Sequence, residues 1–515
     1  MSTTALHAAL RAKPNDAAPG GAPGPVKDVT GVTEITDPAF QADPDPDRPR
    51  LLLIVHQFFP QFHSGTETLC ERCARAYVAM GFAVDIVTSV MVDEAALPPL
   101  LASDVLDAQT RAVLEAPEPP LTRQIRYAYA PHIDVHAFTH SHDPRHGRPR
   151  FLREVTEPAI EALFDRLSEA RRYQRAIVFH LLHVPLKGLA GLAARGIPIS
   201  FVATDFFAVC PIGSQQFEDG RLCRGPGPMS LACVRHLSTG QEGWLGWVQR
   251  INPTLVSAFY LWIFQRLGPW ARLPVHPWQN LYFLVERNRA SRAFLRTCDV
   301  VIAPSSRVAE SLATAGLQKN RIRRLPYGMP PPRQATPPDR LAQPGVRLCY
   351  AAQISPRKGL NVLLDALERL PESLEWQLDI WGDVAQGGRY AAQQAARING
   401  FCGRVRLLGT FASYRIHAVL GGYDYVVLPS TWSENLPLVL LSALQIGQPV
   451  IVSDARGLLD AFPDGRVHGR RFRMGDAADL ARVLEEEIRG RPAYDPSDAP
   501  HIPSVEEFAI ALLGR

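Results

Sequence analysis

The sequence predicts an α/β protein with two parallel-sheet, Rossmann-like halves joined by a linker. Three observations support this prediction. Short apolar runs alternate with stretches of helical period along most of the chain. Polar residues follow several of these runs, where open α/β sheets bind ligands. Six prolines in residues 330–344 indicate a stiff linker between the halves. We therefore expect a ligand in the cleft between them.

Composition excludes several other classes of protein. Apolar residues make up 46% and charged residues 21% of the 515 residues, as in folded soluble proteins. The net charge of +4 is too small to favour nucleic acid as a partner. Eight cysteines in a chain of this length are too few for a disulfide framework. No stretch reads as a membrane span or as the apolar core of a signal peptide, so we expect a cytoplasmic protein.

The N-terminal part divides into a tail and a domain. Residues 1–49 are rich in proline and hold one aromatic residue, Phe40, which predicts a disordered tail. Residues 50–329 form the N-terminal half, and strands are expected at the apolar runs 51–55, 82–88, 176–179, 197–202 and 299–303. A helix between the first two strands ends near Gly81, and the loop before it lacks the dinucleotide-binding glycine pattern.

Residues 210–290 interrupt this alternation. Five tryptophans fall between Trp244 and Trp278, and three arginines, Arg250, Arg266 and Arg272, are interleaved. We expect a helical insertion packed on the N-terminal half. Peripheral contact with a membrane surface, at the inner membrane face, is the alternative left open, because aromatic and arginine residues suit that interface.

Three cysteines precede the tryptophans, at Cys210, Cys223 and Cys233. A structural zinc needs four ligands at close spacing, and His236 is the candidate for a fourth. We expect buried free thiols here and no metal site.

The C-terminal half, residues 345–490, shows a regular strand–helix series. Strands are expected at 346–351, 376–380, 405–408, 423–428 and 449–452. Residues 491–515 form a tail whose last helix opens with Ser504 and has Glu507 three residues later, the spacing of a capping box.

Two strand-to-helix turns of this half carry the chemistry. The first reads Ser433-Glu434-Asn435-Leu436-Pro437, and its proline opens a helix whose free N–H groups favour a phosphate. The Glu434 carboxylate could accept hydrogen bonds from sugar hydroxyls. Its position is explained equally well by a structural role, in which its negative charge complements the dipole at the helix N-terminus.

The second turn contains Gln353, Arg357, Lys358 and Gly359 before another helix. A cation beside a helix N-terminus suits a diphosphate leaving group, whereas position alone favours a solvated Arg-Lys pair.

Together these segments resemble the glycosyltransferases of family four, which have the GT-B fold. The pattern covers roughly residues 50–490. Members typically carry a G-R-L-S-P-E-K-G turn, matched here by residues 352–359, and an S-E-G-F-P-L-V-L-L-E-A turn, matched by residues 433–443. The opening strand with Ser64-Gly65, the Pro326-Tyr-Gly-Met329 segment and the Gly457 loop also fit.

The resemblance implies retaining transfer of a sugar from a nucleotide-sugar to a polysaccharide or lipid-linked acceptor. No cofactor or essential metal is implied. Lys358 and a helix start at Asn435–Leu436 would stabilise the departing diphosphate. The residues carried over are, as catalytic, His180, His183, Asp205 and Glu434; as donor-binding, Gln353, Arg357, Lys358, Ser433, Asn435, Leu436 and Ser442; and on the acceptor side, Ser64 and Gly65.

The chain departs from the family pattern at two donor-site positions. Ser442 stands where relatives have a second glutamate for the ribose diol, and Gln353 stands where they have a phosphate-binding arginine. A serine hydroxyl is shorter than a carboxylate and accepts well from only one hydroxyl. Two alternatives therefore stay open, namely a catalytically degenerate partner protein with the same fold and a nucleotide-sugar epimerase.

Overall fold

The computed structural model describes most of the chain in two compact units. It describes residues 45–62, 64–93, 97–106, 108–115, 123–140, 150–217, 221–227, 230, 232–233, 276–332, 345–384 and 388–514. The first unit holds the described residues up to Val202 together with Phe206–Phe217 and Cys223–Asp299. The second holds Ala203–Asp205, residues 221–222 and the residues from Val300 onward. Residues 1–44 of the expected tail and four of the five tryptophans, Trp244 to Trp270, lie outside the described residues.

The first unit is built on a parallel sheet with one antiparallel edge strand. Its strands run in the order β3-β4-β2-β1-β5-β6, and only the β3–β4 pair is antiparallel. The bounds are β1 Arg50–Ile54, β2 Ala83–Met91, β3 Gln124–Ala130, β4 Ile133–His140, β5 Tyr173–Val178 and β6 Ile199–Val202. The helices are α2 Gly65–Ala79, α3 Pro98–Leu101, α4 Ala108–Leu114, α5 Arg150–Val155, α6 Pro158–Ala170, α7 Leu186–Ala194 and α11 His276–Thr297.

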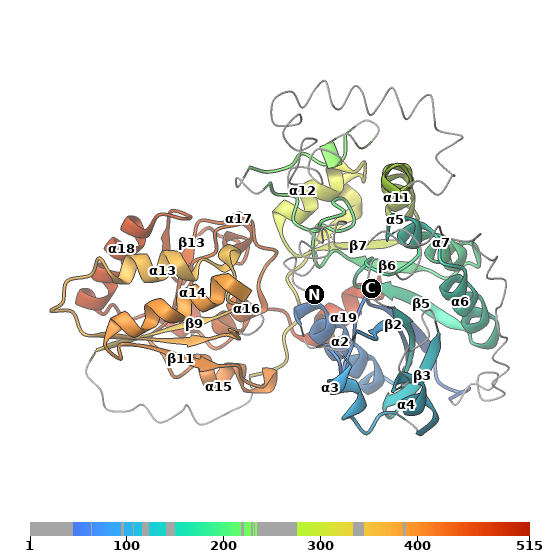
Figure 1. Cartoon of the computed structure of the whole chain (residues 1–515), viewed down its shortest axis with the longest axis horizontal. Coiled ribbons are helices and arrows are strands. Elements are labelled where there is room, and N and C mark those ends of the chain that lie inside the picture. The colour runs from blue at the N-terminus through green and yellow to red at the C-terminus, as the bar shows by residue number, and fades with distance from the viewer. Residues whose placement is uncertain are drawn as a thin grey trace, which may run out of the picture. The chain divides into compact units, whose positions relative to one another are not determined.

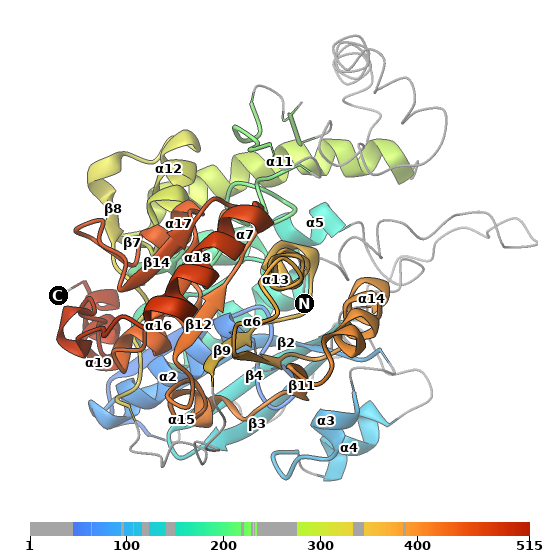
Figure 2. The same cartoon turned by 90° about the vertical axis from the view of Figure 1, so that its left-hand side faces the viewer.

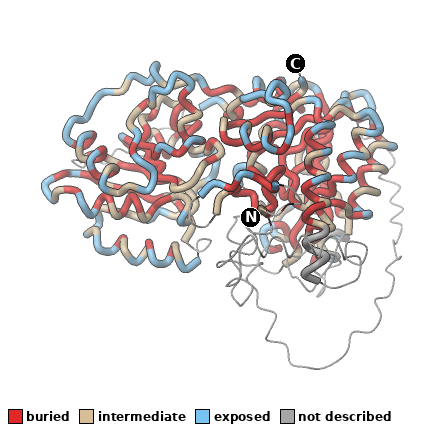
Figure 3. The backbone as a smooth tube through the Cα atoms, turned by 90° about the horizontal axis from the view of Figure 1, so that it is seen from above, coloured by how far each residue is buried: buried red, intermediate tan, exposed pale blue. Residues whose placement is uncertain are grey.

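Sequence analysis named no strand between residues 88 and 176, so it missed β3 and β4. The reason lies in polar residues that β4 buries. His136, Thr139 and His140 are at most 3% exposed, and they break the apolar run by which a buried strand is recognised. The run at β1 has no such interruption, and its four residues Leu51 to Ile54 are all fully buried. Figure 3 shows the buried positions concentrated along the interior of the fold.

The second unit is built on a six-stranded sheet in which all pairs are parallel. The strand order is β11-β10-β9-β12-β13-β14, the doubly wound 3-2-1-4-5-6 arrangement. These strands are β9 Val346–Ala351, β10 Trp376–Trp381, β11 Val405–Gly409, β12 Tyr425–Leu428, β13 Val450–Ser453 and β14 Gly469–Phe472. The parallel pair β7 Val300–Ala303 and β8 Ile322–Arg324 belongs to the same unit.

Helices cover this second sheet (Figure 1), and α13 lies beside α18 (Figure 2). The helices of the unit are α12 Ser306–Thr314, α13 Leu360–Leu367, α14 Gly388–Ile398, α15 Ile416–Leu420, α16 Leu438–Gln445, α17 Arg456–Leu459, α18 Ala477–Gly490 and α19 Val505–Leu512. Apolar side chains of β9, β10, α13 and α18 form one continuous core under them. The predicted capping box of α19 is confirmed, with both Ser504 and Glu507 bonds formed. Within the described ranges, no helix combines the length and apolar character needed to cross a membrane.

Candidate active site

Lys358 and Glu434 lie at the switch point of the second sheet. Lys358 follows β9 and Glu434 follows β12, and these adjacent strands are where the strand order reverses. Helices leave the two strands on opposite sides at such a point, which opens a crevice at their carboxyl ends. The fold therefore brings together two turns that are 76 residues apart in sequence.

The two side chains form a buried, doubly bonded ion pair. Lys358 Nζ donates to Glu434 Oε1 at 2.7 Å and to Oε2 at 3.0 Å. The Ser430 hydroxyl donates to Oε1 at 2.6 Å. The Glu434 side chain is 4% exposed and that of Lys358 is 24% exposed. A carboxylate with these three bonds is held in one orientation, because each bond to a charged group is stronger than a neutral one.

Two glycines allow the turns to approach this closely. A Cβ on Gly359, whose φ is +70°, would stand 1.8 Å from the Pro429 carbonyl oxygen. A Cβ on Gly457 would stand 1.7 Å from the Glu434 carbonyl oxygen. The turns are also joined by the Thr431 N–H, which donates to the Arg357 carbonyl at 2.9 Å. The backbone of Glu434 is thus packed closely against Gly457, and the turn that precedes it is packed against Gly359.

The Trp432 ring lies near two cations of the other turn, Arg357 and Lys358. The Arg357 guanidinium lies 5.4 Å and the Lys358 ammonium 5.8 Å from the centre of its ring. Cations near an aromatic face are attracted by the ring quadrupole. Arg357 and Lys358 are therefore oriented by the turn that carries Glu434, rather than standing as a solvated pair.

The helix after Glu434 begins later than the sequence suggested. Helix α16 begins at Leu438, with extended Pro437 as its N-cap, so the predicted start at Asn435–Leu436 is wrong. Leu436 has a φ of +58°, a left-handed conformation that no α-helix continues. Any N–H groups that the helix offers to an anion are those of Leu438 and the next residues.

Three other residues expected to bind the donor, Ser442, Gln353 and Ser433, are not part of this ion pair. Ser442 is fully buried, and its hydroxyl donates to the Leu438 carbonyl one turn earlier at 2.9 Å. Gln353 and Ser433 are half-buried. The Gln353 carbonyl accepts a bond from the Tyr350 hydroxyl at 3.3 Å. The hydroxyl of Ser442 is therefore engaged by its own helix.

A second polar cluster lies at the switch point of the first sheet. His56 follows β1 and His180 follows β5, and the two rings stack with centroids 4.1 Å apart. His56 Nε2 is 3.4 Å from Glu67 Oε1, and Glu67 also accepts a bond from the Ser64 hydroxyl. His180 Nδ1 accepts the Leu182 N–H at 3.0 Å, which places the proton of the neutral ring on Nε2.

The charge state of His56 is set by burial. Burial first, and then the neighbouring His180, hold the pKa of His56 well below its usual range.

His183 takes a φ of +62° and stacks on His140, with ring centroids 4.2 Å apart. Ser64 is the N-cap of α2, and Gly65 is its first residue.

Asp205 belongs to the second unit, and its charge acts on Tyr327. Burial first, and then the charge of Asp205, raise the pKa of Tyr327. The Tyr327 hydroxyl donates to the carbonyl of Thr204 at 3.3 Å. Asp205 is half-buried at the point where the chain leaves β6.

Sequence reasoning missed His56, Glu67, Ser430 and Tyr327 as contributors to these clusters. His56 and Ser430 each follow a strand by one or two residues, a signal that could have identified them. Glu67 and Tyr327 carry no such mark, because their roles depend on partners that only the folded chain brings near.

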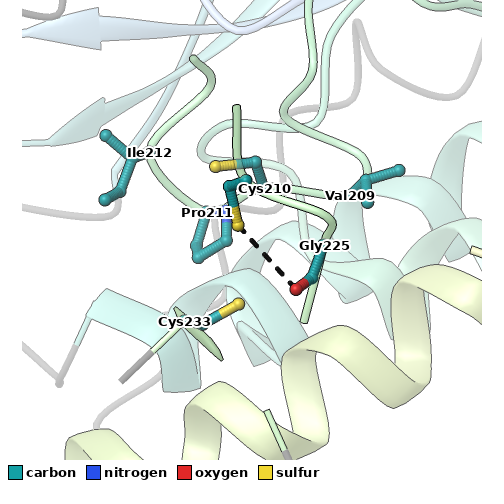
Figure 4. Close-up of a pocket in the computed structure, with 7 residues that line it drawn as sticks. Val209, Cys210, Pro211, Ile212, Gly225 and Cys233 are labelled. Atoms are coloured by element: carbon teal, nitrogen blue, oxygen red, sulfur yellow. Dashed lines mark hydrogen bonds between the residues drawn. The ribbon is translucent and has the colours of Figure 1, made fainter. Parts of the chain in front are cut away.

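The three cysteines line a small pocket in the first unit (Figure 4). They share it with Val209, Pro211, Ile212 and Gly225. All three are buried free thiols, and burial raises the pKa of Cys233 to about 12. Among the residues that the structure describes, no three His, Cys, Asp or Glu side chains are arranged to hold a metal ion. His236 lies outside them.

Comparison with known proteins gives a family match within the second unit. The family described as glycosyl transferases group 1 matches residues 345–488. The sucrose-phosphate synthase of Thermosynechococcus elongatus has a TM-score of 0.51 and 17% identity, over 91% of this chain and 94% of its own. The trehalose-6-phosphate synthase OtsA has a TM-score of 0.51 and 12% identity, over 90% and 94%. At these identities the likeness shows the fold alone.

Sequence relatives share shorter segments. A phosphatidyl-myo-inositol mannosyltransferase of Mycobacterium leprae (strain TN) is 33% identical over 135 residues, which are 26% of this chain and 34% of that protein. A D-inositol 3-phosphate glycosyltransferase of Stackebrandtia nassauensis is 28% identical over 212 residues, 38% of this chain and 47% of that protein. The chain thus spans less than half the length of these relatives.

The fold and the match define the class. The protein has the two-domain GT-B fold of glycosyltransferases, as expected from the sequence. Residues 345–488, which carry Lys358 and Glu434, match the family described as glycosyl transferases group 1, and this match agrees with the resemblance to family four over that part of the chain.

Proposed function

We propose that the protein transfers a sugar from a nucleotide-sugar to a glycan or lipid-linked acceptor, with retention of the anomeric configuration. One observation carries the proposal. A buried carboxylate, Glu434, is fixed by Lys358 and Ser430 at the carboxyl edge of a doubly wound sheet in a glycosyl transferases group 1 domain. Such an edge is where these sheets bind nucleotides.

In this proposal the donor site is built from the two turns of the second sheet. Lys358, Arg357 and the N-terminus of α16 stabilise the departing diphosphate as its negative charge develops. Ser433, Gln353 and the backbone of Asn435 line the donor, and the fixed Glu434 accepts bonds from hydroxyls of the donor sugar. The bond from the anomeric carbon to the diphosphate breaks, the acceptor oxygen bonds to the same face of that carbon, and its proton passes to the departing diphosphate oxygen.

We assign the acceptor side to the first unit. His180 and His183 supply ring nitrogens for hydrogen bonds with the acceptor hydroxyl. Ser64 and Gly65 lie at the start of α2, where the Ser64 hydroxyl donates to Glu67. Asp205, although part of the second unit, serves near the reacting carbon. The acceptor would be a growing surface polysaccharide or its lipid-linked precursor, which places the protein in the cytoplasm or at the inner face of a membrane.

The environment of the Ser442 side chain favours a second candidate function. Its hydroxyl is fully buried and donates to Leu438, so the position offers little to a ribose diol. Together with the uncharged Gln353, this supports a partner protein that retains the fold and lacks catalysis.

A panel of nucleotide-sugars decides between the two. A donor that binds the native state raises the melting temperature through the term RT ln(1 + [L]/Kd). Transfer of a labelled sugar from that donor to a membrane-extracted acceptor should be seen with the wild type and abolished in Glu434→Ala with the fold intact. Transfer at the wild-type rate by Glu434→Ala would overturn the role of Glu434, and donor binding without transfer would favour the partner protein.

A further inference from the structure

The side chain of Asn435 links the turn after β12 to residues 203 and 204 and to Tyr327. Its amide nitrogen donates to the carbonyl of Ala203 at 3.2 Å, to that of Thr204, and to the Tyr327 hydroxyl at 3.2 Å. Its amide oxygen accepts the Ser305 hydroxyl at 3.1 Å. All of these residues belong to the second unit.

The partners of Asn435 are themselves fixed. Ser305 is fully buried and caps α12, where its hydroxyl oxygen accepts the Val308 N–H at 3.3 Å. Tyr327 is 5% exposed and donates to Thr204. The Ala203 N–H donates to the Ile302 carbonyl of β7 at 2.9 Å. Asn435 therefore binds to a framework rather than to a loose loop.

The next residue along that framework is Asp205. The backbone carbonyl of the preceding residue, Thr204, accepts hydrogen bonds from both Asn435 and Tyr327. Asp205 follows Thr204 directly in the chain. The backbone that leads into Asp205 is therefore tied to Asn435 through the carbonyls of Ala203 and Thr204.

On the other side, Glu434 does not need these bonds. Its carboxylate is held by Lys358 and Ser430, and its backbone is confined by Gly457. Loss of the Asn435 side chain should leave the Lys358–Glu434 site in place and release the segment that carries Asp205.

We propose that Asn435 is a positioning residue that holds Asp205 in register with Glu434. The inference rests on the proposed function, because the register matters when Glu434 binds the donor and Asp205 serves the reacting carbon. The left-handed Leu436 directly after Asn435 fits this role, since strained backbone conformations concentrate where the surrounding structure imposes a functional geometry.

The test combines a readout that needs no substrate with one that does. Backbone hydrogen exchange at residues 203–205 is compared between the wild type, Asn435→Ala and Asn435→Asp. Asn435→Asp keeps the shape and removes the N–H donors, so both variants should raise exchange there. Exchange in α13, which follows Lys358, should stay unchanged.

Titrations with UDP, GDP and ADP then separate the register from the donor site. The nucleotide that binds the wild type should bind both variants with an unchanged Kd, whereas kcat should fall by about a hundredfold, as for a misplacement of ~1 Å. Tyr327→Phe should act in the same direction, and the double variant with Asn435→Ala should be no worse than Asn435→Ala alone, because both remove one linkage.

Two outcomes would overturn the inference. One is unchanged exchange at residues 203–205 in both variants. The other is loss of nucleotide binding in parallel with kcat, which would make Asn435 part of the donor site itself. If no nucleotide binds the wild type and no transfer is found, the proposed function fails, and raised exchange at 203–205 would then support only the structural link.

Discussion

Lys358 donates hydrogen bonds to both carboxylate oxygens of Glu434, at 2.7 and 3.0 Å. The pair joins the turn after β9 to the turn after β12 at the place where the strand order reverses. A group that neutralises a buried carboxylate and also faces an expected diphosphate serves both stability and binding. The consequences of breaking the pair can therefore be measured in two ways.

Lys358→Met should lower both stability and donor binding. The variant keeps much of the side-chain volume but leaves Glu434 buried without its cation, at a cost of about 1–3 kcal/mol in the free energy of unfolding. Chemical denaturation measures the first effect and calorimetric titration of the nucleotide the second. Lys319→Met, at an exposed lysine, is the matched control, and equal stability of the two variants would contradict the prediction.

Gly457→Ala should disturb the donor site more than a glycine change elsewhere. Its new Cβ would stand 1.7 Å from the Glu434 carbonyl oxygen, so the backbone of Glu434 must move. Nucleotide binding should weaken measurably. At Gly400 a Cβ meets nothing within 4 Å, and Gly400→Ala should bind like the wild type. Equal affinities of the two variants would show that the Gly457 contact does not shape the site.

Stability should fall as the pH is lowered from 7 to 5. The pKa of His56 is lowered by burial and by His180, and that of His136 is lowered mainly by burial. The unfolded chain therefore binds more protons than the native protein below about pH 6.5, and stability rises with pH through this range.

His56→Gln tests the source of that slope. The variant should flatten the dependence of the unfolding free energy on pH between 5 and 7, whereas His501→Gln, at a side chain 80% exposed, should leave it unchanged. An unaltered slope in His56→Gln, measured by urea unfolding at several pH values, would assign the dependence to other groups.

Asp85→Asn should destabilise the first unit without touching either candidate cluster. The fully buried Asp85 accepts bonds from Arg50 at 3.2 Å, Tyr173 at 2.6 Å and Arg171. These contacts lie near the amino ends of β1 and β5, at the sheet edge away from His56 and His180.

Removing the charge takes this anion away from the buried Arg50 guanidinium and leaves Arg171 with the more distant Asp134, at 3.9 Å. Breaking a buried ion pair in this way typically costs about 3–5 kcal/mol. Thermal unfolding should show a large fall in melting temperature, while nucleotide affinity below that temperature stays at the wild-type value. A stable variant with weakened nucleotide binding would contradict this assignment.

Burial alone would raise the pKa of Asp85, but His136, Arg171 and Arg50 hold it well below its usual range. The stabilisation that Asp85 provides is therefore present at neutral pH and is lost only in strong acid.

The sequence by itself determined the fold class, most strands and the two turns that carry Lys358 and Glu434. These features are local: an apolar run, a turn and a helix start each lie within about ten residues, and backbone propensity and burial act at that range. The capping box of α19 belongs to the same class.

Only the tertiary structure decided which side chains meet. Glu67 reaches His56, Asp85 gathers Arg50 and Arg171, and Asn435 reaches the carbonyls of residues 203 and 204, more than 200 residues away in sequence. The later start of α16 and the burial of Ser442 were settled the same way. A hydrogen bond between distant segments depends on where strand order and helix packing bring their ends together, and neither the spacing nor the composition of one chain records that arrangement.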